Sequence, residues 1–345
     1  MKTIKVALIG FGNVAQSFTR LLLEKEQEIK AKYDTAVSIV AIATKTRGIV
    51  VDAWGIDAER ALGIIESNEA FPESRKSKIQ NTALEVAETV DYDVLIEMTP
   101  LEYASGHTAT SHIEAALRRG KHAICANKGP LAWHFRELID MAKENNCKFR
   151  YESAVMDGTP VFNIVRENLQ LCDVIEIKGV LSRTLNYMLS GMERGMSKKE
   201  IIEEGKNRGI VEANIEEDLS GRESLVKTIA LANALMDADI TPADSDAFDL
   251  KCSSEITHEA IAEAEKRGNV IKFMCRAYRK DGKVHVSVGP EEISAYDMYA
   301  SLSGTTLGVS ITTDLMGTVT IVEEASDIDQ SGYGVLADLI SIINS

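Results

Sequence analysis

The glycine-rich hexapeptide close to the N-terminus constrains the fold of this chain more than any other feature. Residues 10–15 read GFGNVA and directly follow an apolar, β-rich run at 4–9. The residues that come next carry apolar positions at helical spacing, and a second apolar run at 37–43 predicts another buried strand. Strand, glycine turn, helix and strand make a βαβ unit, which is the opening of a parallel sheet.

The small residues of this hexapeptide match the G-x-G-x-x-[G/A] fingerprint of dinucleotide-binding domains. Gly10 makes the tight turn, Gly12 lets a pyrophosphate approach the backbone, and Ala15 lets helix and strand pack closely. The N-terminus of the helix offers amide groups and a positive dipole end to the phosphates. We therefore expect a dinucleotide to bind at Gly10, Gly12, Asn13 and Val14; the alternative is a tight turn that binds no phosphate.

The end of the second expected strand bears on the choice of cofactor. In NAD-binding domains an acidic residue there binds the ribose 2′-hydroxyl. This chain has ATKTRG at 43–48 and therefore no acid at that place. Lys45 and Arg47 suit a 2′-phosphate, so NADP(H) is favoured over NAD(H). The alternative is that both are solvated surface cations.

The alternation of strands and helices continues to about residue 153. Further strands are expected at 93–98, 122–127 and 148–153, and helices at 82–89, 108–119 and 132–146. Near-continuous apolar strands separated by helices indicate a parallel sheet covered on both faces. Residues 45–80 do not fit this pattern, and we expect an elaborated loop with short helices there.

The pattern changes in the second half of the chain. A strand is expected at 172–182, helices at 184–194, 197–207 and 222–238, and β-rich runs at 284–290 and 308–322. We predict an α/β protein with a Rossmann-type nucleotide-binding domain over 1–153 and a second, α+β domain over 154–331, whose sheet is mixed or antiparallel. The C-terminal helix, 332–345, is expected to pack back on the first domain.

Composition excludes several classes of protein. The formal net charge of −15 argues against nucleic acid as a partner, because binding to its phosphates needs clustered Lys and Arg. No apolar stretch approaches the roughly 18 residues of a membrane span, and the N-terminal run is too short for a signal peptide. The five cysteines are widely spaced, without a CxxC pair, as in a reduced protein. We expect a cytoplasmic protein that binds neither nucleic acid nor membrane.

Several blocks then follow one another over most of the chain and together resemble the homoserine dehydrogenases. They are GFGNVA, DVLIEMTP, HIEAALRRGKHAICANKGPLA (112–132), YESAVMDGTPV (151–161), TLNYML (184–189), GIVEANIEEDLSGRESLVKTIALA (209–232) and GYGVLADL (332–339). The likeness is to the short form, which lacks a C-terminal regulatory domain. It implies NAD(P)-dependent interconversion of L-homoserine and L-aspartate 4-semialdehyde, a step of threonine and methionine biosynthesis. It also implies a homodimer formed through the sheet of the second domain.

Hydride transfer from an alcohol carbon needs a group that handles the hydroxyl proton, and the resemblance assigns this chemistry to Lys128 and Lys227. Lys128 follows the expected strand 122–127, at the carboxyl end where ligands bind in parallel sheets. Lys227 lies on the helix 222–238, whose same face continues in apolar residues, so it is expected to point into a partly enclosed site. The alternatives are a surface lysine in a loop and a solvated i,i+4 ion pair with Glu223.

The resemblance also implies binding residues. Glu212 and Glu223 would hold the amino group of the substrate, Thr184 would contact the substrate, and Thr99 would join Lys128 at the cofactor. For Glu212 the alternative is one more acid in the acidic run 212–218.

The block at 151–161 resembles a loop that binds a monovalent cation, Na⁺ or K⁺. The Glu152 side chain and the carbonyl groups of Val155, Asp157 and Thr159 would supply oxygen ligands of the kind that a hard ion prefers. A glycine-containing hinge between the domains is the alternative, and both readings are compatible with each other.

Four departures from the family pattern weaken the choice of substrate more than the choice of fold. Arg183 stands where a small residue is usual, Glu223 replaces an aspartate, Leu307 replaces an asparagine, and 323–327 replaces a glycine-rich loop. The alternative function is therefore a related NAD(P)-dependent dehydrogenase acting on another small hydroxy or oxo acid, with Arg183 selecting an additional acidic group. A homologue that binds a nucleotide without catalysis is the remaining alternative, and the presence of both lysines argues against it.

Overall fold

The structure is a computed structural model that describes residues 1–71, 82–211, 219–324 and 328–344. The chain divides into two compact units, one comprising Met1–Phe162 with Asp327–Ser345 and the other Asn163–Ser326. Within the described residues, no helix combines the length and the apolar character that crossing a membrane requires.

The sheet of the first unit has the strand order of a dinucleotide-binding fold. Its strands are β1 (Lys2–Ile9), β2 (Thr35–Ala43), β3 (Ile49–Val51), β4 (Val94–Glu97), β5 (His122–Cys125) and β6 (Phe149–Arg150). They are arranged in the order β3-β2-β1-β4-β5-β6, and all neighbours are parallel except β2 and β3. The order reverses between β1 and β4, where such sheets bind their ligands. The predicted parallel sheet is confirmed; the antiparallel edge strand β3, inside the expected loop 45–80, was not predicted.

Helices cover both faces of this sheet. They are α1 (Asn13–Glu24), α2 (Glu26–Tyr33), α3 (Ala58–Glu66), α4 (Ala83–Thr89), α5 (His107–Arg118), α6 (Lys128–Trp133), α7 (Phe135–Glu144) and α14 (Ile328–Ile343), with a 3-10 turn at Glu152–Ala154. Alternate residues of β1 point to opposite faces: Val6 and Leu8 join a core formed with α1, α3 and α14, whereas Ala7 and Ile9 join a core formed with α4 and α5.

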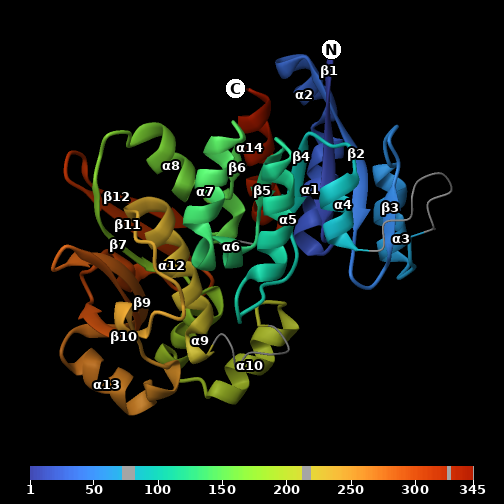
Figure 1. Ribbon diagram of the computed structural model, residues 1–345. Helices are drawn as coiled ribbons and strands as arrows, with labels where there is room; N and C mark the ends of the chain where they lie inside the picture. Colours follow the sequence, from blue (N-terminus) through green and yellow to red (C-terminus); the bar gives the residue numbers. More distant parts are fainter. Residues whose placement is uncertain (72–81, 212–218, 325–327, 345) are drawn as a thin grey trace. The chain divides into compact units, whose positions relative to one another are not determined.

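The C-terminal helix α14 belongs to the first unit and lies along α1 (Figure 1). Close backbone approach makes this packing possible, because a Cβ atom on Gly332 of α14 would lie 2.7 Å from the amide nitrogen of Phe18 in α1. The Ser17 hydroxyl of α1 donates a hydrogen bond of 2.8 Å to Asp329 in the first turn of α14.

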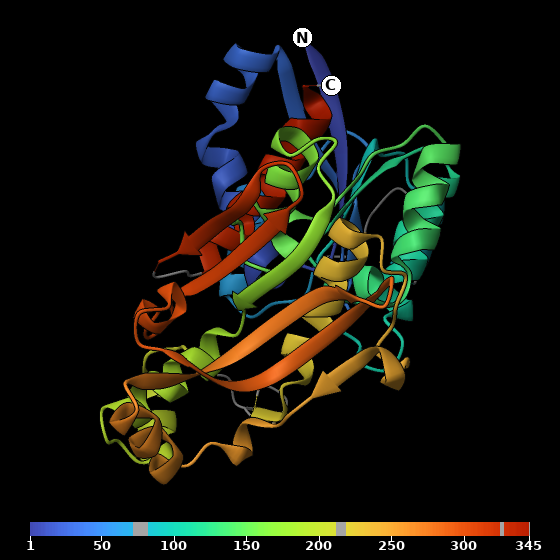
Figure 2. The ribbon, with the colours of Figure 1, turned by 90° about the vertical axis from the view of Figure 1, so that its left-hand side faces the viewer.

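The second unit contains a mixed sheet, as predicted. Its strands are β7 (Val174–Val180), β8 (Phe248–Leu250), β9 (Asn269–Lys280), β10 (Lys283–Ser294), β11 (Leu307–Thr313) and β12 (Gly317–Glu323). The order is β12-β11-β7-β9-β10-β8, and only the β8–β10 pair is parallel. The β9–β10 hairpin contributes two neighbouring strands to this sheet, between β7 and β8 (Figure 2). Strand β9 was not predicted from the sequence.

Among the described residues, the second unit has the helices α9 (Arg183–Glu193), α10 (Lys198–Asn207), α12 (Arg222–Met236) and α13 (His258–Lys266), and α8 (Val161–Asn168) begins in the first unit. Short 3-10 turns occupy Ser245–Ala247, Ser253–Glu255 and Met298–Ser301. Helix α10 begins with a reciprocal capping box between Ser197 and Glu200. Helix α12 packs on β7, β9 and β10.

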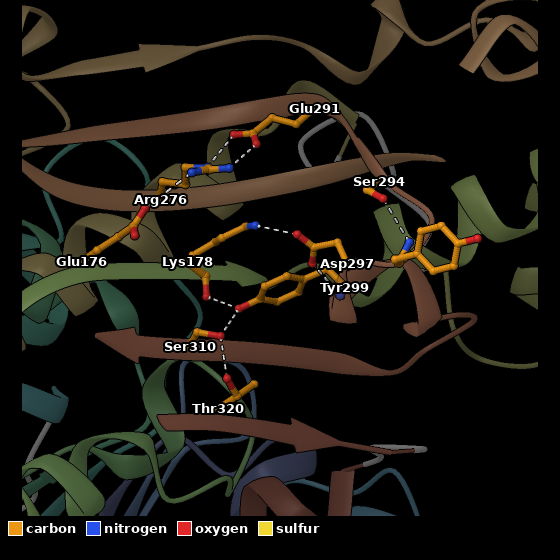
Figure 3. Close-up of polar contacts among 10 residues, drawn as sticks. Glu176, Lys178, Arg276, Glu291, Ser294, Asp297, Tyr299, Ser310 and Thr320 are labelled. Carbon is orange, nitrogen blue, oxygen red and sulfur yellow. Dashed lines mark hydrogen bonds and ion pairs between the residues drawn. The ribbon is translucent and has the colours of Figure 1, made fainter. Parts of the chain in front are cut away.

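The other face of the second sheet carries a network of polar side chains (Figure 3). Arg276 forms a two-pronged ion pair with Glu291, at 2.8 and 2.6 Å, and a longer one with Glu176. The Lys178 ammonium lies 3.2 Å from Asp297. These side chains are partly buried and neutralise one another, so this face is polar without a large net charge.

Candidate active site

The glycine loop lies at the point where the strand order of the first sheet reverses. Gly10 follows β1 with φ of +92°, and a Cβ atom there would lie 2.6 Å from the carbonyl oxygen of Met98 at the end of β4. Gly12 caps α1, and a Cβ atom there would have no heavy atom within 4 Å. The first turn of α1 has no acidic residue. The loop therefore presents open backbone and a positive helix end to an anionic ligand.

The residues after β2 form a tight turn into β3. Lys45 is exposed, whereas Arg47 is held in place by residues of the following segment. Its guanidinium donates to the Asn68 side chain at 2.7 Å and to the Glu69 carbonyl at 3.1 Å. Arg47 is thus a positioned cation at the end of β2 and not a freely solvated one.

A buried carboxylate, Glu97, stands at the end of β4. It was not predicted from the sequence. Glu97 is 0% exposed, and its Oε1 accepts hydrogen bonds from the amide and the hydroxyl of Thr99. Its Oε2 lies 2.6 Å from Nδ1 of His112 on α5. An acid inside the apolar run DVLIEM, just before Thr-Pro, was the available clue. Thr99, an expected cofactor residue, is therefore held by a buried acid.

Lys128 is the first residue of α6, and not part of a loop as one alternative had it. Asn127 caps this helix: its Oδ1 accepts from the Gly129 amide at 2.9 Å. Its Nδ2 donates to the carbonyl oxygens of Thr99 and Pro100, at 2.9 and 3.2 Å. The carboxyl ends of β4 and β5 are thereby linked, and the half-buried Lys128 follows directly from this link.

Lys227 lies on α12 in an enclosed place, with 14% of its side chain exposed. Its Nζ lies 3.4 Å from Oε1 of Glu223 and donates a 3.1 Å hydrogen bond to the carbonyl of Leu181. Leu181 follows β7 and precedes Ser182, the N-cap of α9. The pair with Glu223 exists but is not a solvated surface pair, because the Glu223 side chain is only 25% exposed.

Comparison with known proteins gives a consistent result over both units. The family model described as homoserine dehydrogenase matches residues 160–340, and the model of the NAD binding domain of homoserine dehydrogenase matches residues 10–152. This chain belongs to the homoserine dehydrogenase family. It is accordingly an NAD(P)-dependent oxidoreductase that acts on a CH–OH group, and the predicted family and fold class are confirmed.

Relatives and solved structures agree with the family. The chain is 31% identical over 346 residues to the NAD(+)-dependent homoserine dehydrogenase of Pseudomonas canavaninivorans, covering 100% of this chain and 97% of the relative. It is 31% identical to the homoserine dehydrogenase of Methanocaldococcus jannaschii, covering 99% and 98%. A crystal structure assigned to a homoserine dehydrogenase of Archaeoglobus fulgidus matches with a TM-score of 0.85 at 27% identity, covering 99% of each chain.

A hyperthermophilic archaeal homoserine dehydrogenase solved in complex with NADPH shares the fold, with a TM-score of 0.82 at 22% identity and coverage of 98% and 97%.

The structure places most of the departures from the homoserine dehydrogenase pattern. Arg183 is the half-buried first residue of α9, close in the chain to the Leu181 carbonyl that accepts from Lys227. Thr184 beside it is buried, at 8% exposure. Leu307 is 2% exposed at the start of β11, where an apolar side chain suits the interior. Glu212 and residues 325–327 lie outside the described residues.

The expected cation loop of this homoserine dehydrogenase lies against α14. The Glu152 carboxylate is 2% exposed and accepts from the Phe162 amide at 2.8 Å, while the Glu152 amide donates to Asp338 of α14. Asp157 adopts a left-handed φ of +47°, and its side chain accepts from Ser331. Val155 and Thr159 are buried in the same loop. The buried Glu152 carboxylate is an oxygen donor of the kind that a hard cation prefers.

Proposed function

We propose that Lys128 and Lys227 carry the proton chemistry of homoserine oxidation in this chain. The reaction moves a hydride from the hydroxyl-bearing carbon to the nicotinamide and releases the hydroxyl proton, which leaves an aldehyde. The observation that carries the proposal is the enclosure of Lys227 between the Glu223 carboxylate and the Leu181 carbonyl. An ammonium held in such a place can orient a substrate hydroxyl and exchange its proton.

We infer that the second unit binds the amino-acid part of the substrate. Glu223 lies in the first turn of α12 and Thr184 in the first turn of α9. Together with Glu212 they supply carboxylates for an ammonium group and a hydroxyl for a polar contact. The substrate proposed is L-homoserine, with L-aspartate 4-semialdehyde as the product, on the route to threonine and methionine. Arg183 supports the second candidate, a substrate that carries an additional acidic group.

The test is a spectrophotometric assay of purified protein with homoserine and either nicotinamide cofactor. Lys128→Ala and Lys227→Ala should each lower kcat/KM at least about a hundredfold, the usual effect of removing a proton-transfer group. Lys143→Ala is the matched control, because Lys143 is 70% exposed and pairs only with Asp140 among the described contacts. Full activity of either variant would reject that lysine, and turnover confined to other hydroxy acids would reject homoserine.

For the cofactor we propose NADP(H) in preference to NAD(H). Positioned Arg47 and exposed Lys45 at the end of β2, with no acid in 44–48, support a 2′-phosphate. Fluorescence titration should give a Kd for NADPH about tenfold below that for NADH, and Arg47→Ala should remove most of this difference. Tenfold tighter binding of NADH would contradict the proposal, and the NAD(+)-dependent relative makes this a real alternative.

We further propose that the loop at Glu152, Val155, Asp157 and Thr159 binds Na⁺ or K⁺. The buried Glu152 carboxylate supports this. Activity or thermal stability should rise with NaCl or KCl when tetramethylammonium chloride keeps the ionic strength constant. Equal values in all three salts would reject the site.

We propose a cytoplasmic homodimer formed through the second unit. The five cysteines form no disulfide with one another in the part of the chain that the structure describes, which suits a reducing compartment. The polar sheet face drawn in Figure 3, with its neutralised ion pairs, supports a dimer face that does not repel a second copy. Sedimentation velocity should give twice the mass of one chain, and Arg276→Glu, which places like charges beside Glu291 and Glu176, should dissociate it.

A further inference from the structure

A buried carboxylate–imidazole pair in the first unit has no part in the proton chemistry proposed above. Glu97 and His112 are 0% and 6% exposed at the side chain, and they approach to 2.6 Å. Burying two polar side chains removes them from water at a cost, and apolar side chains of similar volume often give equal or greater stability. The pair stands at the carboxyl end of β4, where ligands bind in sheets of this kind. Its position points to a role beyond stability.

The first effect of Glu97 is on Thr99. Both the amide and the hydroxyl of Thr99 donate to Oε1 of Glu97. A hydroxyl that gives its hydrogen to a carboxylate has only lone pairs to offer to another group. The Thr99 hydroxyl is therefore fixed as an acceptor, and the group that it meets must be a donor.

The cofactor supplies such a donor. In folds of this kind a bound dinucleotide would place its adenosine half at the end of β2 and its pyrophosphate at the N-terminus of α1, so that the nicotinamide half would extend toward the end of β4. The carboxamide NH₂ and the ribose hydroxyls of that half are the donors available to Thr99. His112 holds Oε2 of Glu97, which leaves Oε1 directed at Thr99.

The second effect reaches Lys128. Asn127 binds the Thr99 and Pro100 carbonyls with one end of its side chain and caps α6 with the other. A shift of Thr99 would therefore move the cap, and with it the first residue of α6.

We infer that Glu97 and His112 are positioning residues, which hold Thr99 as the hydrogen-bond acceptor for the nicotinamide half of the cofactor and, through Asn127, set the place of Lys128. This rests on the roles proposed for Thr99 and Lys128.

The test is a double-mutant cycle on the Kd of NADPH, measured by fluorescence without substrate. Glu97→Gln and Thr99→Val should each raise the Kd about tenfold, the equivalent of one hydrogen bond of about 1.4 kcal/mol. The double variant should be no weaker than the worse single variant, because both changes break the same contact. Additive effects would overturn the inference, since Glu97 would then act independently of Thr99.

Variants of His112 supply a second measurement that does not depend on the folding of Glu97→Gln. His112→Gln keeps a donor for Glu97 and should keep the Kd within about threefold, whereas His112→Leu should raise it about tenfold. Tyr92→Phe is the control: it removes a buried hydrogen bond to the Ala87 carbonyl in the same unit, away from the carboxyl ends of the strands. It should lower Tm and leave the Kd unchanged.

If Glu97→Gln and His112→Leu lower Tm as Tyr92→Phe does, with wild-type Kd and kcat, the pair is merely structural and the inference is wrong. Failure of the proposed function looks different. Lys128→Ala would then retain activity, or homoserine would not react, while the Kd effects of Glu97→Gln and His112→Leu would persist.

Discussion

The two glycines of the nucleotide loop should respond in opposite ways to a single added methyl group. Gly10→Ala places a Cβ atom 2.6 Å from the Met98 oxygen, 2.8 Å from the Met98 carbon and 3.0 Å from the Thr99 nitrogen, all backbone atoms of the adjacent strand end. It also forces an L-residue to φ near +92°. In Gly12→Ala, φ stays at −80° and the methyl group meets nothing within 4 Å.

The structure sets the size of each effect. For Gly10→Ala, the left-handed backbone costs about 1–2 kcal/mol and the overpacking about 1–3 kcal/mol, so the free energy of unfolding should fall by roughly 2–5 kcal/mol. For a unit of this size that lowers Tm by roughly 5–15 °C. For Gly12→Ala, a slightly poorer helix cap offsets the smaller entropy of the unfolded chain, so Tm should barely change. Its methyl group would instead occupy the space through which a pyrophosphate reaches the backbone, and the Kd should rise about tenfold or more.

Differential scanning fluorimetry and NADPH titration of both variants decide the matter. Gly10→Ala should lose stability and affinity together, because Thr99 must move. Gly12→Ala should lose affinity alone. An unchanged Tm for Gly10→Ala, or wild-type NADPH binding by Gly12→Ala, would refute the reasoning that places the cofactor on this loop.

Other changes test separate parts of the molecule. Arg183→Gly should raise homoserine turnover severalfold if the guanidinium narrows the substrate site, and identical kinetics on all hydroxy acids would place Arg183 outside it. Ser197→Ala should cost about 1 kcal/mol by removing the cap of α10, seen as a lower urea midpoint, whereas Ser197→Asp should restore it. Hydrogen bonds from Arg267 lower the pKa of Glu292 from 4.5 to about 2. The stabilising contribution of Glu292 is thus present above pH 4.5 and lost as pH falls toward 2, so the Tm difference from Glu292→Gln should vanish over that range. A difference that is constant with pH would contradict this.

The sequence predicts an element well where the pattern of apolar residues within that element is sufficient, and poorly where the element depends on partners distant in the chain. The parallel strands of the first sheet were found because both of their faces are buried, which makes them continuous apolar runs. Strand β9 was missed because charged residues interrupt it. Lys272 in that strand is 1% exposed, yet its ammonium is satisfied by Glu193 and by the Leu302 carbonyl, both distant in sequence. A single sequence does not show such partners.

The candidate site shows the same division. The enclosure of Lys227 could be predicted, because the apolar character of its helix face is local information. Its contact with the Leu181 carbonyl could not, since that depends on how α12 packs on the sheet. The Glu97–His112 contact could not be predicted either, because its two residues belong to different elements and lie 2.6 Å apart only in the folded chain.

The packing of α14 on α1 has a consequence for how the chain folds during its synthesis. The core beneath α14, which includes Val335, Leu336 and Leu339, belongs to a unit whose other residues precede position 163. During synthesis the second unit is therefore completed first, while the core of the first unit still lacks the apolar side chains of α14. Dinucleotide binding should therefore appear only after α14 has been synthesised. A ribosome-bound chain that stops before residue 328 should bind chaperones and should be a poor ligand for NADPH.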